Sequence, residues 1–98
     1  MKGMTIAAMT KACGGVYHGP EDCIDKVISA VTIDSRNVTR DGLFIAIKGE
    51  RSDGHNYIAG CYEAGVLCCV SEKELESDER PYIQVESTLQ ALKDLAEL

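Results

Sequence analysis

The segment from Leu43 to Val70 constrains the fold of this chain more than any other part of the sequence. It begins with five consecutive apolar residues, Leu43 to Ile47, a run typical of a strand covered on both faces. Apolar side chains then recur at helical spacing from His55 to Ala64, and a second short apolar run spans Val66 to Val70. This order predicts two parallel strands joined by a right-handed crossover helix.

The other apolar patterns predict three strands and two helices. The predicted strands are Val16–His18, Lys26–Ile33 and Tyr82–Val85, and the predicted helices are Met4–Cys13 and a closing helix after Ser87. In the closing helix we expect Leu89, Leu92, Leu95 and Ala96 to form the buried face. In the crossover helix Tyr57 counts among the apolar positions. The predicted fold is α/β, with a small mixed, largely parallel sheet flanked by helices.

Size and charge limit the classes of partner. A chain of 98 residues with 45% hydrophobic side chains suits one domain with a single core. The net charge of -6 argues against nucleic-acid binding, which needs clustered Lys and Arg. The acidic segment 72–79 is expected to be solvated, and no chemistry is assigned to it. No apolar segment approaches the ~20 residues of a membrane helix, so no membrane partner is expected.

The cysteines indicate a reducing compartment. Five is an odd number, so they cannot all pair within the chain, and the start lacks the apolar run of a secretory signal. A cytoplasmic protein with buried free thiols is therefore expected. Cys68 and Cys69 are neighbours in a predicted strand and should point to opposite faces, which makes them poor partners for one metal ion.

Polar loops follow two of the predicted strands. Asp34-Ser35-Arg36 comes directly after the strand that ends at Ile33, and a glycine-containing polar segment from Lys48 to His55 follows Ile47. Open α/β sheets bind ligands at the carboxyl ends of their strands, and these loops offer hydroxyl, carboxylate and guanidinium groups. The pattern predicts a site for a polar ligand, although two ordinary surface loops explain it nearly as well.

Several motifs that carry chemistry are missing from the sequence. It contains no G-x-x-x-x-G-K-[ST] phosphate loop, no G-x-G-x-x-G after a strand, no G-x-S-x-G elbow and no H-E-x-x-H helix. His18 and His55 lie far apart in sequence, and neither has an evident catalytic partner. We therefore predict no catalytic residues and no metal site in this chain.

Three motifs together resemble the amino-terminal domain of the Mur ligases of peptidoglycan synthesis. They are Ile33–Arg36, Asp41–Arg51 and Asp53–His55. The resemblance covers almost the whole chain and is weakest over the first thirty residues. The run Gly49–His55 is most similar to the members that join D-alanyl-D-alanine to UDP-N-acetylmuramoyl-tripeptide. The sister members that add the third peptide residue share Asp34-Ser35-Arg36 but usually differ in the second loop.

The resemblance implies a division of labour between domains. Residues 1–98 would be the domain that holds the uridine diphosphate end of UDP-N-acetylmuramoyl-tripeptide. A central domain that binds ATP and Mg, and a third domain that receives the dipeptide, would be absent from this chain. The isolated domain should then need no cofactor and have no activity of its own. Its partners would be the muramyl substrate and its own central and carboxyl-terminal domains.

The resemblance also assigns roles to residues. The substrate-binding set that it implies is Ser35, Arg36, Lys48, Gly49, Glu50, Arg51 and Ser52. Ser35 would bond the uridine, whereas Arg36 would either meet a phosphate or brace its loop through Asp34. Arg51 suits the diphosphate, because a guanidinium forms two parallel charge-assisted bonds. Asp34, Asp53 and His55 would support the loops, with Asp53 as a helix cap.

Two alternatives stay open at this stage. The chain could belong to the sister ligase that adds the third residue, or it could be a stand-alone interaction module whose loops contact a protein. Reading the natural gene beyond Leu98 separates the ligases from the module, because a ligase requires a downstream phosphate loop within a few tens of residues.

Overall fold

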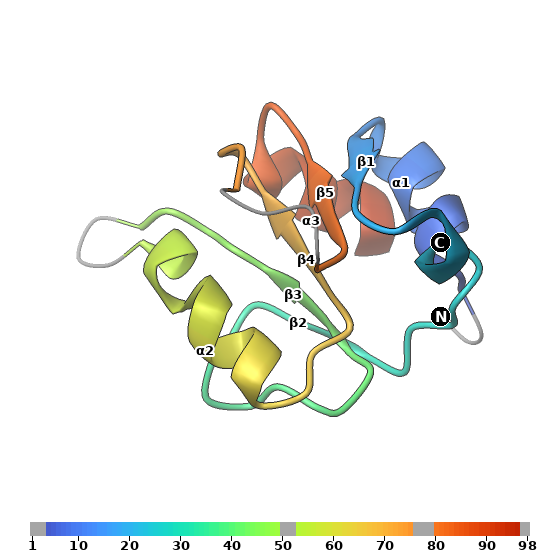
Figure 1. Cartoon of the computed structure of the whole chain (residues 1–98). Coiled ribbons are helices and arrows are strands. Elements are labelled where there is room, and N and C mark those ends of the chain that lie inside the picture. Colours follow the sequence, from blue (N-terminus) through green and yellow to red (C-terminus); the bar gives the residue numbers. More distant parts are fainter. Residues whose placement is uncertain (1–3, 50–52, 76–79, 97–98) are drawn as a thin grey trace.

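A single mixed sheet organises the computed structural model, which describes residues 4–49, 53–75 and 80–96. Its strands, in the spatial order β1-β5-β4-β3-β2, are β1 (Val16–His18), β5 (Tyr82–Gln84), β4 (Cys68–Ser71), β3 (Leu43–Ile45) and β2 (Val31–Thr32). Four strands run parallel and β1 pairs antiparallel with β5 at one edge (Figure 1). The predicted mixed, largely parallel α/β sheet is confirmed.

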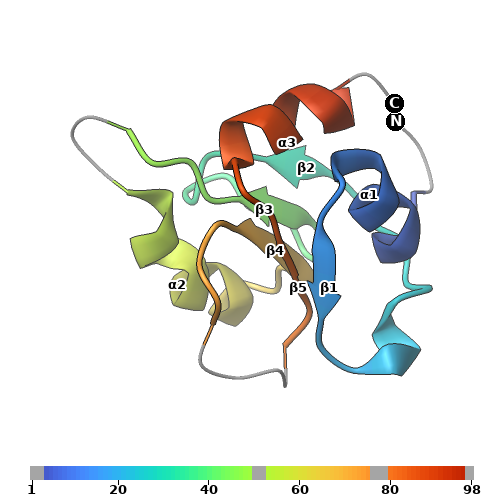
Figure 2. The same cartoon turned by 90° about the horizontal axis from the view of Figure 1, so that it is seen from above.

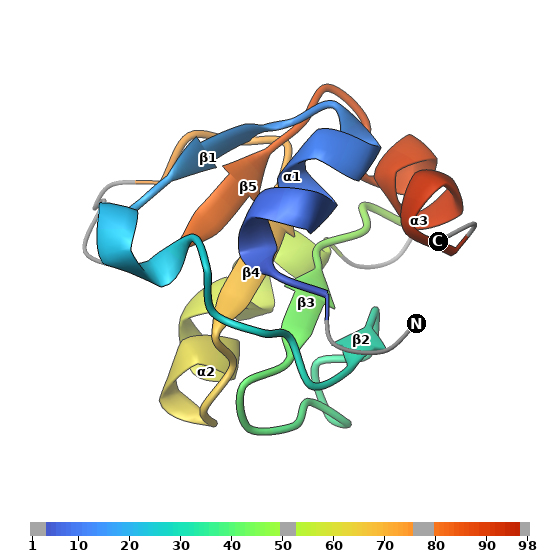
Figure 3. The ribbon, with the colours of Figure 1, turned by 90° about the vertical axis from the view of Figure 1, so that its right-hand side faces the viewer.

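Helices cover both faces of this sheet. On one face, α1 (Ile6–Cys13) and α3 (Thr88–Ala96) lie side by side, as Figures 2 and 3 show. On the other face lies α2 (Ile58–Glu63), which follows directly on the 3-10 helix η2 (Gly54–Tyr57). A second 3-10 helix, η1 (Glu21–Cys23), follows β1. Within the described residues no helix has the length and apolar character needed to cross a membrane.

Strand β3 contributes to both hydrophobic cores because its side chains alternate between the faces. Leu43 and Ile45 pack into the core beneath α1 and α3, whereas Phe44 packs into the core beneath α2. Cys68 and Cys69 of β4 divide in the same way, as their adjacency in a strand predicts. Burial raises the pKa of both thiols, that of Cys69 to about 12, so both are protonated and pack as small apolar groups.

Local signals fix the ends of α1. The hydroxyl of Thr5 accepts a hydrogen bond of 3.1 Å from the backbone N–H of Ala8, which caps the first turn. Gly14 ends the helix in the left-handed conformation at φ 66°, where its N–H bonds back to Lys11.

The strand predicted over Lys26–Ile33 is too long. Only Val31–Thr32 pairs with β3, and Val27 forms an isolated bridge to Thr5. The backbone N–H of Ile28 bonds to Met4, and that of Ser29 bonds to Asp41. These bonds hold the segment against two different parts of the chain, so it cannot run alongside β3.

The buried face of α3 also differs from the prediction. The buried residues are Thr88, Ala91 and Leu95, whereas Leu89 is 53% exposed and Ala96 is exposed. Ser87 caps the helix, because its hydroxyl accepts from the N–H of Gln90 at 3.1 Å. The rotation follows from Thr88, whose N–H and hydroxyl both donate to the carboxylate of Glu72.

Candidate functional site

Two loops leave the same edge of the sheet because β2 and β3 are parallel neighbours. Val31 lies opposite Leu43, and Thr32 lies opposite Phe44. The first loop, residues 33–37, follows β2, and the second loop, residues 46–53, follows β3. Both loops therefore start at the carboxyl ends of adjacent strands, where α/β sheets bind ligands.

Asp34 organises the first loop. Its Oδ1 accepts from the backbone N–H of Arg36 at 2.9 Å and from Arg36 Nε at 3.2 Å. Its Oδ2 accepts from Asn37 Nδ2 at 3.0 Å. These donors, the backbone N–H of Arg36 first, hold the pKa of Asp34 below its usual value. The Arg36 side chain is 89% exposed, so it braces the loop through Nε and still presents its outer nitrogens to solvent.

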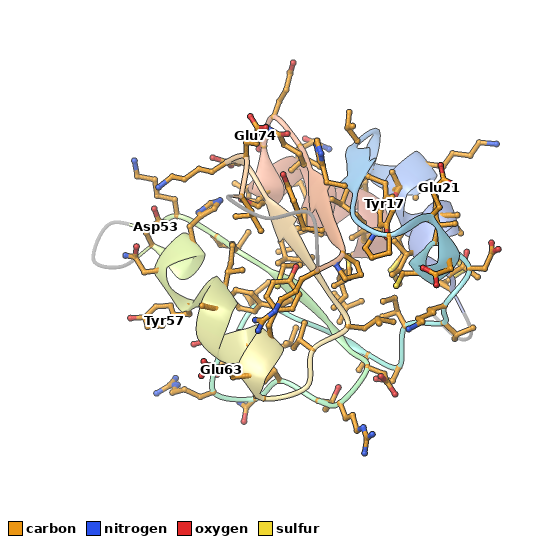
Figure 4. All side chains as sticks on the ribbon, viewed as in Figure 1. Tyr17, Glu21, Asp53, Tyr57, Glu63 and Glu74 are labelled. Carbon is orange, nitrogen blue, oxygen red and sulfur yellow. The ribbon has the colours of Figure 1, made fainter. Side chains whose placement is uncertain are left out.

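A hollow of about 470 Å³ lies at the first loop. It is lined by Ile33, Asp34, Ser35, Arg36 and Tyr57. Tyr57 is the last residue of η2, which follows the second loop, so the hollow lies between the first loop and the end of η2. The described residues of the second loop are not among those that line it. Figure 4 shows Tyr57 projecting outward, on the same side of the molecule as Asp53.

Tyr57 lines this hollow, which the sequence did not reveal. Helical spacing places Tyr57 on the packed stripe of the crossover helix, but in the structure this segment is a 3-10 turn and the residue is 48% exposed. The available signal was its position, because an aromatic residue one turn after a strand-end loop can face the loop that follows the neighbouring strand.

The base of the second loop is closed by backbone pairing. Lys48 and Asp53 form an antiparallel bridge, and the N–H of Gly54 bonds to the carbonyl of Ile47 at 2.9 Å. Lys48 and Gly49 are exposed at this edge. The other predicted members of the second loop, Glu50, Arg51 and Ser52, lie outside the described residues.

The three residues after the second loop have distinct local roles. The Asp53 carboxylate caps η2 by accepting from the N–H of His55 at 3.0 Å. Gly54 lies so close to β3 that an added Cβ would stand 2.8 Å from the backbone nitrogen of Ile47. The imidazole of His55 is 5% exposed. Each of the three therefore fixes where η2 begins.

Hydrogen bonds connect this turn to the end of β4 and, through Glu72, to the start of α3. The N–H of Glu72, just beyond β4, donates to Nε2 of His55 at 3.0 Å. Nε2 must then be an acceptor, so Nδ1 carries the proton and donates to Asp53 Oδ1 at 2.6 Å. The Glu72 carboxylate accepts from the N–H and hydroxyl of Thr88, at 2.8 and 3.0 Å.

Glu72 was missed because it begins an acidic segment that should be solvated. In the structure it joins the end of β4 to the start of α3. The N–H of Thr88 is the main cause of a lowered pKa of Glu72, so its carboxylate is charged near neutral pH. In the part of the chain that the structure describes, no group of three or more His, Cys, Asp or Glu residues could hold a metal ion.

These bonds predict a loss of stability in acid. The N–H and imidazole of His55 lower the pKa of Asp53 from 3.8 to about 2. Because the folded pKa is below the unfolded one, the stabilisation is complete above about pH 4 and disappears as the pH falls toward about 2. Asp53→Asn keeps an oxygen that can cap η2 but removes this titration.

Urea unfolding between pH 2 and 5 measures the effect. The free energy of unfolding should fall less steeply with acid in Asp53→Asn than in the unmodified chain. Equal slopes would show that Asp53 is not held in its charged form by the fold.

Solved structures share this fold. The structure of MurF from Acinetobacter baumannii superimposes with a TM-score of 0.84 at 28% identity, over 97% of this chain and 20% of that chain. MurF ligase from Thermotoga maritima, in complex with ADP, superimposes with a TM-score of 0.60 at 32% identity, over 68% of this chain and 16% of that chain.

Sequence comparisons agree with the structural match. A sequence model described as Mur ligase family, catalytic domain, matches residues 27–98. The UDP-N-acetylmuramoyl-tripeptide--D-alanyl-D-alanine ligase of Bacillus subtilis is 38% identical over 72 residues, which are 71% of this chain and 16% of the relative. The UDP-N-acetylmuramoyl-L-alanyl-D-glutamate--2,6-diaminopimelate ligase of Bacillus licheniformis is 37% identical over 81 residues, 83% of this chain and 16% of the relative.

The chain belongs to the Mur ligase family of peptidoglycan synthesis. It spans about a sixth of the length of these curated relatives. Relatives that add different amino acids match it about equally well.

Proposed function

We propose that the chain binds the uridine nucleotide end of a UDP-N-acetylmuramoyl-peptide. One observation carries this proposal: two relatives named for different added groups, D-alanyl-D-alanine and diaminopimelate, each match more than two thirds of this chain, at 38% and 37% identity. Their names share only the UDP-N-acetylmuramoyl portion of the substrate. A segment that is equally similar in both is expected to recognise what their substrates have in common.

The paired loops suit such a ligand. We propose that Ser35 bonds the uridine and that Arg36 and Lys48, exposed at the same sheet edge, face the diphosphate with Gly49 beside them. Arg51, with Glu50 and Ser52, is proposed from sequence to complete the second loop. Asp34, Asp53 and His55 are proposed to hold the loops in place through the bonds described above.

Bond formation would take place in other parts of a larger cytoplasmic enzyme. The sequence contains no Walker phosphate loop, so we propose that ATP and Mg are bound by a central domain and the incoming amine by a third domain, both outside this chain. Binding energy from the distant nucleotide end would then position the peptide carboxylate for reaction.

Calorimetric titration of the chain tests the proposal. UDP and UDP-N-acetylmuramoyl-tripeptide should both bind, whereas ADP and D-alanyl-D-alanine should not. Binding of ADP but not UDP would contradict it, and the absence of binding to all four ligands would favour the interaction module.

Within the family, we propose the ligase that adds D-alanyl-D-alanine, on the resemblance of Gly49–His55 to that member. The gene beyond Leu98 should encode a G-x-x-G-K-[ST]-type loop. The encoded enzyme should consume ATP with UDP-N-acetylmuramoyl-tripeptide and D-alanyl-D-alanine. Turnover with diaminopimelate and UDP-N-acetylmuramoyl-L-alanyl-D-glutamate instead would assign the chain to the sister ligase.

Loss of Arg36 should weaken nucleotide binding. Arg36→Ala removes a guanidinium that we propose to contact the diphosphate, and the exposed setting limits the expected loss in affinity for UDP to about three- to tenfold. Arg40→Ala is the matched control. Arg40 is also an exposed arginine, but it lies in the turn before β3, at the amino end of that strand and away from the two loops. Equal losses in the two variants would point to net charge rather than to a local contact.

A further inference from the structure

The imidazole of His55 is the middle of a hydrogen-bond chain that joins three separate elements. Asp53, at the base of the second loop, accepts from Nδ1 at 2.6 Å, and the N–H of Glu72, just after β4, donates to Nε2 at 3.0 Å. The carboxylate of Glu72 in turn accepts from the N–H and hydroxyl of Thr88, in the first turn of α3. The chain of bonds therefore links the second loop to α3.

Burial makes this link stiff at its centre. The side chain of His55 is only 5% exposed, so water has little access to replace a lost partner. A neutral imidazole offers one donor and one acceptor, and both are used here. A buried ring nitrogen without a partner costs free energy, so His55 has to follow a displacement of Asp53, and Glu72 has to follow His55.

The direction of the Glu72 N–H is set by groups outside the second loop. The preceding residue, Ser71, is buried, and its carbonyl accepts from the N–H of Val85. Its hydroxyl donates to the carbonyl of Lys73 and accepts from the N–H of the same residue, at 2.8 and 3.0 Å. The bond between the Glu72 side chain and Thr88, which is 1% exposed, then holds residue 72 from the side of α3.

Asp53 carries the connection into the second loop. It pairs with Lys48 in an antiparallel bridge, and Lys48 is exposed at the sheet edge where we place the diphosphate. Lys73, the residue after Glu72, also reaches Asp53, with Nζ 3.6 Å from Oδ2. The end of β4 thus contacts Asp53 both through His55 and through Lys73. A ligand that restricts Lys48 should therefore restrict Asp53 and the groups bonded to it.

We propose that Glu72 and Thr88 are positioning residues for the second loop, acting through His55, so that nucleotide binding and the capping of α3 are coupled. This inference rests on the proposed function and adds a connection from the nucleotide site to a helix on the opposite face of the sheet from α2 (Figure 3). Such coupling is reciprocal, so the factor by which the contact strengthens UDP binding is also the factor by which UDP strengthens the contact.

Calorimetric UDP titration of four variants tests the first half of this reciprocity. Glu72→Ala should weaken binding by about two- to tenfold, the range for residues that act through a packed network. Thr88→Val should cause a smaller loss, because the backbone N–H can still donate, and Glu72→Gln should restore most of the affinity, because it keeps an acceptor oxygen. Ser87→Ala is the matched control, since it removes the other cap of α3 without touching Glu72, and it should bind UDP as the unmodified chain does.

Amide hydrogen exchange of the unmodified chain tests the second half. Saturating UDP should slow exchange at the amides of Glu72 and Thr88, because both donate within the chain of bonds. The amide of Ala8, which donates to Thr5 in the corresponding cap of α1, should exchange at the same rate with and without UDP.

The outcomes separate this inference from the proposed function. If UDP binds the unmodified chain and a folded Glu72→Ala equally well, the coupling is wrong and the nucleotide site stands. Equal losses in Glu72→Ala and Ser87→Ala would also overturn the coupling, because they would trace the effect to a weaker α3. Should Glu72→Ala not fold, unchanged affinity in Thr88→Val together with unchanged exchange at Thr88 overturns it. If the unmodified chain does not bind UDP, both proposals are wrong.

Discussion

Gly54→Ala should destabilise the chain by about 1–3 kcal/mol, the range for forcing extra atoms into a packed site. The new Cβ would stand 2.8 Å from the nitrogen of Ile47 and 3.1 Å from the Cα of Ala46. Both contacts are with backbone atoms of the segment that continues β3, so no side chain can rotate away. The turn at Asp53 would have to move, and nucleotide affinity should fall with stability.

Gly60→Ala is the matched control for this change. Gly60 lies in α2, and an added Cβ there meets nothing within 4 Å. Replacing a helical glycine by alanine at such a position should stabilise the chain by roughly 0.5–1 kcal/mol. Urea unfolding gives both values. Opposite signs are expected, and a neutral Gly54→Ala would show that the turn does not depend on close contact with β3.

His55→Ala should cost about 1–3 kcal/mol of folding free energy, because it removes a buried ring that serves both as donor and as acceptor. The N–H of Glu72 would lose its partner on Nε2, and Asp53 would lose the donor on Nδ1. The connection from the second loop to the end of β4 would then be broken. Nitrogen chemical shifts of the unmodified imidazole should report a neutral ring protonated on Nδ1.

His18→Ala provides the comparison for the other histidine. His18 stacks on Tyr82 with ring centroids 4.7 Å apart and bonds to Gln84, so its removal should cost only about 0.5–1.5 kcal/mol. Amide hydrogen exchange shows which backbone hydrogen bonds each substitution weakens. The Glu72 amide should exchange faster in His55→Ala but not in His18→Ala. Unchanged exchange at Glu72 in His55→Ala would contradict the proposed hydrogen-bond connection.

The sequence predicts the middle of this fold well because its signals are local. The apolar run at Leu43–Ile47 marks β3, and helical spacing followed by Gly65 marks the crossover helix α2, which ends at Glu63. Gly65 adopts a φ of 106°, which glycine accepts readily. The turn at Asp41, where φ is 62°, and the helix caps at Thr5 and Ser87 likewise depend on residues within a few positions of one another.

The details that the sequence did not predict depend on contacts between distant segments. Thr88 turns inward because Glu72, sixteen positions earlier, accepts its hydrogen bonds. Tyr57 meets the first loop only because β2 and β3 are adjacent and η2 begins as a 3-10 turn. Hydrophobic periodicity reports neither relation, so it assigned both regions incorrectly.

Backbone amide NMR during a UDP titration tests the central claim most directly. The predicted result is that signals of the first loop, residues 33–37, and of Lys48, Gly49 and Tyr57 shift together along one saturating curve. Signals of Arg40 and of α1, which lie away from this sheet edge, should stay in place. Shifts confined to residues outside these two loops and η2 would contradict a nucleotide site at the carboxyl ends of β2 and β3.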